Sequence, residues 1–184
     1  GVGLIKNYKK MLSMGLKKEE NLILVIGKTE GHLEQTIFAR EILSEKKGPP
    51  PEINLFNEKN NGLTISKLIK DNLIESCHDV SLGGILIATS KMCIKSNKGI
   101  KINNLKNLIN KFEYFFSEDQ GRYLVEINKD NFKKVEKVLI DNSVHFDELG
   151  VVNDNKFLFS DEIDLSIEDL IKAYKNWLKK YMVN

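Results

Sequence analysis

Three short segments of the chain carry residue types that could bind or act on a polar ligand. The first runs from Gly27 to His32, the second from Cys77 to Gly84, and the third from Ser117 to Arg122. Glycines, hydroxyls, carboxylates, imidazoles and one guanidinium are concentrated there. The candidate ligand-contacting residues are Gly27, Thr29, Gly31, His32, His78, Asp79, Ser81, Gly83, Gly84, Glu118, Asp119, Gln120 and Arg122.

The first segment, Gly27-Lys28-Thr29-Glu30-Gly31-His32, lies between an apolar run and a stretch with helical spacing. A strand, a turn with glycines and a helix N-terminus together present free backbone N–H groups, which favour a phosphate or carboxylate. Its two glycines allow close approach of a ligand or of another backbone segment. The same pattern also occurs in strand–helix turns that bind nothing, and the Walker spacing is absent.

The second segment contains His78 next to Asp79, followed by Ser81 and the pair Gly83-Gly84. Asp79 and Ser81 are suitable caps for the helix predicted to follow, and the glycines would let its first turn approach a neighbour. Adjacent residues on a strand point to opposite faces, so we expect no catalytic pair between His78 and Asp79. His78 is interpreted as a partly buried structural histidine.

The third segment, Phe115-Phe116-Ser117-Glu118-Asp119-Gln120-Gly121-Arg122, precedes a predicted strand. Its acidic residues, amide and arginine could bind a polar ligand at a sheet end, or could hold a turn through local hydrogen bonds. Two adjacent carboxylates make a poor closed metal site without further ligands, and no metal site is expected. His145 and the two cysteines, Cys77 and Cys93, are interpreted as structural.

The elements that must position these segments alternate along the chain. The continuous apolar run 21–26 predicts a strand covered on both faces. Apolar residues at helical spacing predict helices, and Ser166-Ile167-Glu168-Asp169 has the pattern of a capping box that opens the last helix. Further strands are expected at 75–80, 99–102 and 123–127, helices at 32–45, 63–73, 85–93 and 131–140, and a hairpin at 146–152 and 156–159 around residues 153–155. The expected fold is α+β, a mixed β-sheet flanked by helices.

Composition narrows the class of protein. The chain has 184 residues, which suits one domain, and a net charge of +2. Its only arginines are Arg40 and Arg122, so the basic footprint of a nucleic-acid-binding protein is missing. No apolar run reaches the roughly 18–20 residues of a membrane span, and no signal peptide is recognisable. We therefore expect no nucleic-acid partner and no membrane partner. The expected location is the cytoplasm. The chain begins with Gly1 in a strand-like run, which suggests a piece of a larger protein.

The three segments, in this order, resemble a known domain family. His78-Asp79-Val80-Ser81-Leu82-Gly83-Gly84 is similar to the loop His-Asp-Val-Ser-Asp-Gly-Gly. The segment 27–33 is similar to the loop Gly-x-Thr-x-Gly-x-Leu. The segment from Phe116 to Tyr123 resembles Phe-Gly-Glu-Asp/Ser-Gln-x-Arg. These loops are typical of the domain that ends each half of phosphoribosylformylglycinamidine synthase. The same domain closes aminoimidazole ribonucleotide synthase and the hydrogenase-maturation and selenophosphate-synthesis enzymes.

The resemblance implies that residues 1–184 form the C-terminal domain of a larger synthetase, whose preceding ATP-binding domains are absent from this chain. In that family the enzyme amidates formylglycinamide ribonucleotide with glutamine-derived ammonia, using ATP and Mg²⁺, in purine biosynthesis. The catalytic groups lie in the preceding domains, so this chain is expected to hold none and to bind no cofactor alone. The implied partners are the rest of the synthetase chain, a glutaminase subunit and a small bridging subunit.

Two alternatives and two departures accompany this resemblance. The chain could instead close an aminoimidazole ribonucleotide synthase or a related ATP-dependent synthase, or be an interaction module that kept the fold and lost the chemistry. Leu82 stands where the family has Asp, and Glu34 where it has Gly. A glutamate at that position would repel a phosphate. We also expect the three segments to meet at one edge of the sheet, and an exposed apolar surface where other domains would pack.

Overall fold

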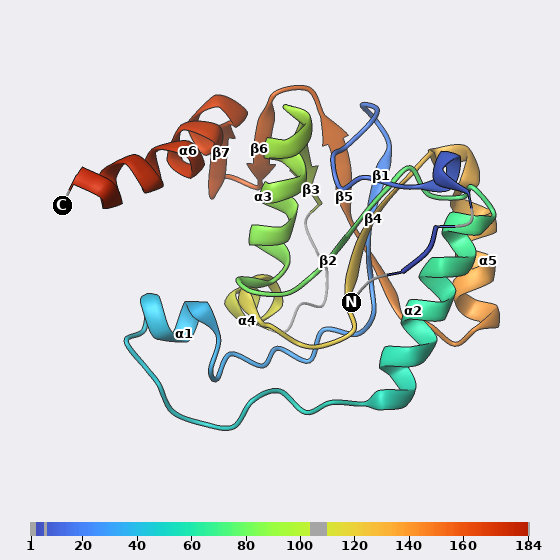
Figure 1. Ribbon diagram of the computed structural model, residues 1–184, viewed down its shortest axis with the longest axis horizontal. Coiled ribbons are helices and arrows are strands. Elements are labelled where there is room, and N and C mark those ends of the chain that lie inside the picture. The colour runs from blue at the N-terminus through green and yellow to red at the C-terminus, as the bar shows by residue number, and fades with distance from the viewer. Residues whose placement is uncertain (1–2, 6, 104–109, 184) are drawn as a thin grey trace.

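The chain folds into one mixed β-sheet with helices on both faces, as the sequence predicts. The computed structural model describes residues 3–5, 7–103 and 110–183 (Figure 1). Within this part, the strands are β1 (Leu22–Ile26), β2 (Ser76–Asp79), β3 (Gly99–Ile102), β4 (Tyr123–Ile127), β5 (Phe146–Asn153), β6 (Lys156–Phe159) and β7 (Ile163–Ser166). The helices are α1 (Ile37–Glu41), α2 (Leu55–Lys70), α3 (Gly84–Ser96), α4 (Lys111–Phe116), α5 (Phe132–Asp141) and α6 (Ile167–Val183), with 3-10 turns η1 (Tyr8–Lys10) and η2 (Lys129–Asn131).

In the described residues the sheet has the strand order β2-β4-β1-β5-β3-β6-β7. Every neighbouring pair is antiparallel except β3 and β6, which run parallel. Because β2 and β1 both pair antiparallel with β4, their carboxyl ends and the start of β4 lie at the same end of the sheet. This topology delivers the loops after β1 and β2 and the loop before β4 to one place.

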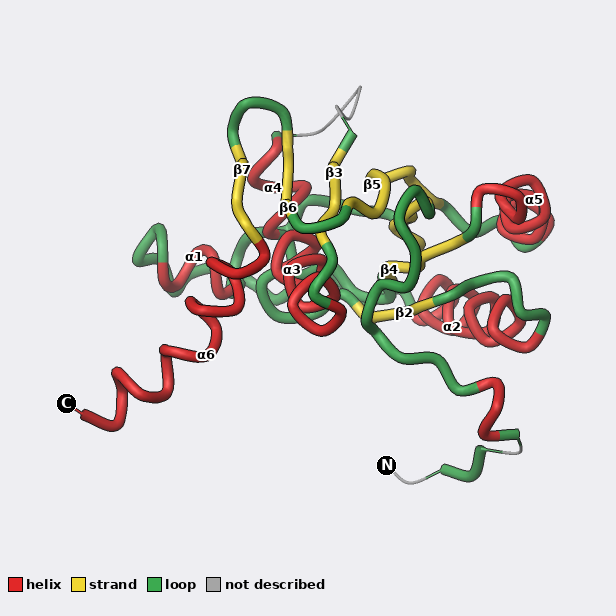
Figure 2. Tube along the Cα trace, turned by 90° about the horizontal axis from the view of Figure 1, so that it is seen from above, coloured by secondary structure: helices red, strands yellow, loops and turns green. Residues whose placement is uncertain are grey.

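β1 is the strand on which both layers of the core pack. Ile23 and Val25 point into the cluster that includes α3 and α4, whereas Leu24 and Ile26 point into the cluster that includes α2 and α5. All four side chains are buried, which explains why this strand reads as a continuous apolar run rather than an alternating one. Figure 2 shows α3 and the pair α2 and α5 in different parts of the molecule around the sheet.

The predicted hairpin between residues 146–152 and 156–159 is wrong. β5 and β6 do not pair, because β3 lies between them and bonds to both. Gly99 at the start of β3 makes this insertion possible, since a Cβ there would lie 2.0 Å from the Lys156 carbonyl oxygen. The backbone N–H of Gly99 donates to the carbonyl of Asp154 in the turn, which fixes the two strands around β3.

Other predicted elements have the right type but different bounds. The helix expected at 32–45 is only α1, and the one expected at 63–73 begins eight residues earlier as α2. β7 was not predicted. The capping box at the start of α6 is confirmed, because the backbone N–H of Asp169 donates to the Ser166 hydroxyl at 3.1 Å.

A buried carboxylate holds the N-terminal segment on the sheet. Glu126 of β4 is fully buried, and its two oxygens accept the backbone N–H groups of Lys17 and Lys18. They also accept the Asn21 amide at 2.8 Å and the Ser76 hydroxyl at 3.0 Å. A carboxylate at this depth is tolerated because its acceptor capacity is filled by these donors.

We therefore predict that Glu126→Gln lowers the free energy of unfolding by about 2–3 kcal/mol, since the new NH₂ group would face donors and leave them unpaired. Chemical denaturation measures this effect. Glu148→Gln, on the exposed side of β5, is the matched control and should change stability by less than about 0.5 kcal/mol. Equal effects of the two substitutions would contradict the assignment.

Candidate functional site

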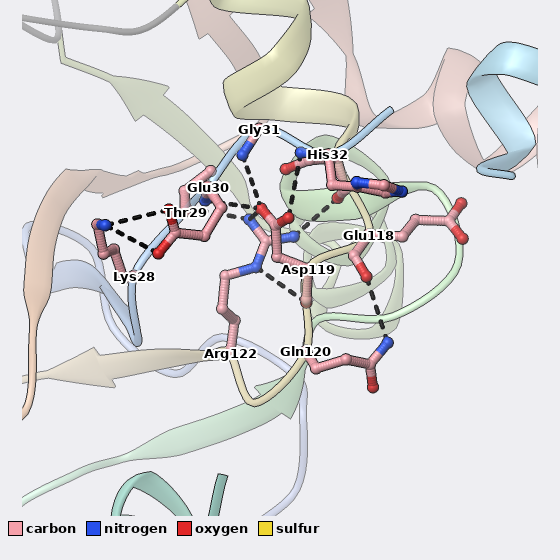
Figure 3. A network of polar contacts seen from close by, with 10 residues as sticks. Lys28, Thr29, Glu30, Gly31, His32, Glu118, Asp119, Gln120 and Arg122 are labelled. Atoms are coloured by element: carbon pink, nitrogen blue, oxygen red, sulfur yellow. Dashed lines mark hydrogen bonds and ion pairs between the residues drawn. The ribbon is translucent and has the colours of Figure 1, made fainter. Parts of the chain in front are cut away.

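Asp119 organises the loop that follows β1. Its side chain is buried, and Oδ2 accepts the backbone N–H groups of Glu30 at 2.9 Å and Gly31 at 3.0 Å. Oδ1 accepts the N–H of His32 at 3.1 Å (Figure 3). Three successive backbone donors thus converge on one carboxylate, in the manner of an anion-binding nest. The anion that this loop binds is a side chain of the same protein.

Arg122 supports the same loop from inside. Its guanidinium is fully buried and donates to the Ser117 carbonyl at 2.7 Å, the Thr29 hydroxyl at 3.0 Å and the Asp119 carbonyl at 3.2 Å. Its Nη1 also lies 3.7 Å from Oδ2 of Asp119. Burial lowers the pKa of Arg122 from its ordinary value, and the nearby Asp119 opposes that shift. The arginine is therefore occupied within the protein and offers no free donor plane to a phosphate.

Glu118 joins the second predicted segment to the other two. Its Oε1 accepts the backbone N–H of Gly83 at 2.8 Å and that of Ile37, at the start of α1, also at 2.8 Å. The Glu118 backbone N–H donates to the His32 carbonyl. The expectation that the three segments meet is thus confirmed, and they meet at the ends of the strands rather than along an edge of the sheet.

Glycines permit the close approach of these loops. Gly27 has φ +96°, and a Cβ there would lie 2.7 Å from the Gly121 carbonyl oxygen. Gly84 has φ +71°, and a Cβ there would lie 2.5 Å from the carbonyl oxygen of Phe115. Any larger residue at Gly27 or Gly84 would force the segments apart. The predicted role of these two glycines in backbone approach is confirmed.

Two expectations about helix ends are wrong. The loop after β1 does not lead directly into a helix, because α1 starts only at Ile37 and is capped by the Thr36 hydroxyl. Neither Asp79 nor Ser81 caps α3 through its side chain: the N-cap is Gly83 in the left-handed region, without a side-chain cap bond. Glu118 instead accepts the N–H groups of Ile37 and Gly83 at the starts of both helices, and a partner more than thirty positions away along the chain cannot be recognised from local sequence.

The expectation that His78 and Asp79 point apart is also wrong. Nδ1 of His78 lies 3.2 Å from Oδ1 of Asp79, because at the end of β2 the exposed carboxylate reaches back to the ring. Nε2 of His78 is buried and has no hydrogen-bond partner among the described residues. Burial lowers the pKa of His78, and Asp79 only partly opposes this shift. The neutral imidazole is therefore the favoured form in the folded protein.

This shift predicts a pH dependence of stability. Since the folded pKa of His78 lies below its unfolded value of about 6.5, the unfolded chain takes up the proton first as pH falls. The contribution of neutral His78 to the free energy of unfolding is fully present above pH 6.5 and is lost as the pH falls toward the folded pKa. The difference in unfolding free energy between the protein and His78→Gln should therefore shrink from pH 7.5 to pH 5, as measured by denaturation. Parallel pH profiles would contradict it.

A polar cleft lies beside these loops. It has a volume of about 1050 Å³ and opens between the loop after β1, the segment before α2 and the loop before β4. Of the predicted residues, Gly31, His32, Asp119 and Gln120 line it. The other predicted residues are not among those that line it: Gly27, Thr29, His78, Asp79, Ser81, Gly83, Gly84, Glu118 and Arg122.

Sequence reasoning missed much of the cleft wall. The additional polar residues include Glu52, Asn54, Asn57, Glu58 and Asn61, with Ser143 and His145 from the turn before β5. Most of them lie at the start of α2. This part of the helix is polar, so it lacks the spacing of apolar residues that predicts a helix. Lys28 also lines the cleft and pairs with Glu30 at 2.8 Å. The lining residues therefore include four side-chain amides, two imidazoles and four carboxylates, and the lysine among them is paired with Glu30.

The sequence of the chain identifies this fold. Residues 18–160 match the model of the family described as AIR synthase related protein, C-terminal domain. The chain belongs to this family. The AIR-synthase-related domain, with its two loop carboxylates, is thus the unit that carries the cleft.

Comparison with known proteins places this AIR-synthase-related domain within longer chains. It is 61% identical over 184 residues to phosphoribosylformylglycinamidine synthase subunit PurL of Pelagibacter ubique, covering 100% of this chain and 25% of that protein. The chain thus spans about a quarter of the length of the curated relatives it matches. No helix in the described ranges has the length and apolar character to span a membrane.

Solved structures confirm the fold of the AIR-synthase-related domain. T. maritima PurL complexed with FGAR has a TM-score of 0.70 and 17% identity, covering 89% of this chain and 30% of that one. The same protein complexed with ATP gives a TM-score of 0.67, and PurLQS from Thermotoga maritima gives 0.66, each covering 89% of this chain and 28% of that one. At such identities the likeness concerns the fold.

We predict that Asp119→Asn frees the loop after β1. The amide keeps one acceptor oxygen but turns an NH₂ toward backbone donors, so stability should fall by about 2–3 kcal/mol. The amides of Glu30, Gly31 and His32 should exchange with solvent faster, as NMR hydrogen exchange would show. Asp154→Asn, in the exposed turn after β5, is the matched control. Unchanged exchange at the three amides would contradict the role given to Asp119.

Proposed function

We propose that this domain is the C-terminal part of a PurL-type synthetase subunit and forms one wall of a ligand site that other domains of the subunit complete. The observation that carries the proposal is the 61% identity to PurL over all 184 residues. The polar cleft at the meeting point of the three loops supports it. A wall without its own catalytic groups is consistent with a chain that spans a quarter of its relatives.

The proposed reaction is the amidation of formylglycinamide ribonucleotide. The γ-phosphoryl group of ATP passes to the oxygen of the substrate amide, which releases ADP. Ammonia then attacks the carbon that carries this oxygen and displaces phosphate, giving formylglycinamidine ribonucleotide. Positioning and electrostatic stabilisation supply most of the catalysis in phosphoryl transfer, so groups from several domains must converge. The proposed contribution of this chain is to bind and orient, not to transfer a proton or phosphoryl group.

The residues of the cleft do not fit a complete site for ATP and Mg²⁺. Both oxygens of Asp119 already accept backbone N–H groups, and the lysine among the lining residues, Lys28, is paired with Glu30. No group of three His, Cys, Asp or Glu side chains with metal-ligand spacing occurs in the described ranges. A triphosphate with its metal ion needs several free cations or carboxylates in one place. These features support the proposal that the phosphoryl-transfer groups lie in other domains.

The neutral part of the cleft suits the uncharged portions of a ribonucleotide. Gln120 is exposed, and its one hydrogen bond, to the Glu118 carbonyl, is long at 3.4 Å. Asn54 is the N-cap of α2 and accepts the backbone N–H of Asn57 at 3.0 Å, and Asn57 lies in the first turn of the helix. Amide side chains both donate and accept, so they can recognise ribose hydroxyls and an amide group. We propose Gln120, which the sequence already predicts, and in addition Asn57 and His145 as ligand-contacting residues.

Partners and location follow from the same proposal. A PurL-type subunit would act with a glutaminase subunit that supplies ammonia and with a small bridging subunit, in the cytoplasm. The name PurLQS of the solved Thermotoga maritima assembly supports a multi-subunit complex. The rest of the synthetase chain is the partner on which this domain depends most.

The full-length subunit that contains this domain should form phosphate and formylglycinamidine ribonucleotide from ATP, ammonia and formylglycinamide ribonucleotide. Gln120→Ala should lower kcat/KM about tenfold, mainly through KM, because one ligand hydrogen bond is lost. Steady-state kinetics with phosphate detection measures this. Asn155→Ala, in the exposed turn between β5 and β6, is the control and should leave the kinetics unchanged.

Two results would overturn the proposal. One is a full-length subunit that shows no amidation activity with these substrates. The other is micromolar affinity of the 184-residue chain alone for ATP in calorimetry, since the domain would then hold a nucleotide site of its own.

A further inference from the structure

Among the described residues, the contacts of the last helix with the core come from its first turns. Ile167 is buried, and Leu170 and Ile171 pack on the core cluster that includes α3. Beyond these residues α6 extends away from the sheet, as Figures 1 and 2 both show. The predicted exposed apolar surface is found here.

One face of the outer half of α6 is aromatic and exposed. Tyr174, Trp177, Leu178 and Tyr181 have exposed fractions of 66%, 64%, 55% and 69%. Their spacing of three and four residues puts them on one face of the helix, in line with Ile167 and Leu170. The rings of Trp177 and Tyr181 stack with centroids 5.6 Å apart. We call these four residues the aromatic face of α6.

The charges around the aromatic face are of one sign. From Leu170 onward the helix carries Lys172, Lys175, Lys179 and Lys180, and this stretch of sequence contains no acidic residue. At 100° per residue, Lys175 and Lys180 flank the aromatic face on opposite sides. Two copies of α6 packed face to face would therefore bring lysines against lysines. The charge pattern favours a partner that carries carboxylates around an apolar surface.

The comparisons indicate where this partner lies. The match to the shared family domain ends at residue 160, before α6 begins. The match to PurL of Pelagibacter ubique, in contrast, covers the whole chain, including α6, and three quarters of that protein lie outside it. The helix thus accompanies the PurL type of chain rather than the shared domain. A surface found on the same subunit is the occupant that this pattern favours.

We propose that the aromatic face of α6 docks into an apolar groove rimmed by carboxylates on another part of the same PurL-type chain. This inference rests on the proposed membership of this domain in such a subunit. The docked helix fixes the domain against the rest of the chain, and thereby holds the polar cleft in register with the groups that complete it. Burial of four large apolar side chains supplies the attraction, and the lysines determine the orientation.

Hydrogen exchange of the full-length subunit, read by mass spectrometry on the peptide covering residues 172–183, tests the proposal. In the unaltered subunit this peptide should exchange slowly. The double variant Trp177→Gln/Tyr181→Gln should exchange at least tenfold faster. The matched control, Tyr8→Gln/Met11→Gln, removes two equally exposed apolar side chains of η1 and the residue after it, and should leave exchange of α6 unchanged.

A second variant pair tests the carboxylate rim. Lys175→Glu/Lys180→Glu preserves the aromatic face and the helix but reverses the flanking charges, so exchange should again rise. Unchanged protection in this variant would overturn the proposed rim. Fast exchange of α6 in the unaltered subunit would overturn the docking itself.

The other possible occupants give different results, and each overturns the proposal. Protection that grows with protein concentration, together with a dimer mass in light scattering, would indicate a second copy. Protection that appears only with phosphatidylglycerol vesicles would indicate a lipid surface. Amidation activity with an unprotected α6 would reject the docking while the proposed function stands. A protected α6 in an inactive subunit would leave the docking and reject the function.

Discussion

The arrangement of the loops depends on one buried interaction, the acceptance of three backbone N–H groups by the carboxylate of Asp119. A charge at that depth is costly unless its hydrogen-bonding capacity is filled. Here the donors come from consecutive residues of the loop after β1, and Arg122 provides the opposite charge. Because both partners are themselves bonded to backbone, the pair fixes two loops at once. The loops are therefore set before any ligand arrives.

The sheet topology makes this interaction possible. β1 and β4 are antiparallel neighbours, so the end of β1 and the start of β4 are adjacent, and the loops that continue from them must meet. β2 pairs with β4 on the side opposite β1, so the segment that precedes α3 reaches the same place. Short connections at Gly27 and Gly84 then bring the backbones into contact. The position of the cleft is thus a consequence of strand order, and its polarity a consequence of the residues in three separate loops.

The parts of the structure that follow from local physics were predictable from sequence. β1 is buried on both faces and α3 is rich in apolar residues, so composition alone reveals them, and the Ser166 cap is encoded within four residues. The failures involve partners distant in sequence. Three features each require tertiary contacts: the insertion of β3 between β5 and β6, the hydrogen bond from Gly83 to Glu118 before α3, and the contribution of α2 to the cleft. Residue type indicated which loops meet, but not which atoms would remain available to a ligand.

The polar groups of the three loops have partners within the domain, whereas the apolar face of α6 does not among the described residues. In the three loops, the strongest anion-binding groups have found internal partners, so little free energy remains for ligand binding there, and ligand contacts fall to neutral side chains. On α6 the opposite holds, because a helix of this length is marginally stable in water and gains most from packing of its apolar face. That face lacks a partner among the described residues. In this domain the polar loops have their hydrogen-bond partners, whereas the apolar face of α6 is exposed. Such a domain is suited to be positioned by other domains through α6, and its cleft then faces the groups that complete the site.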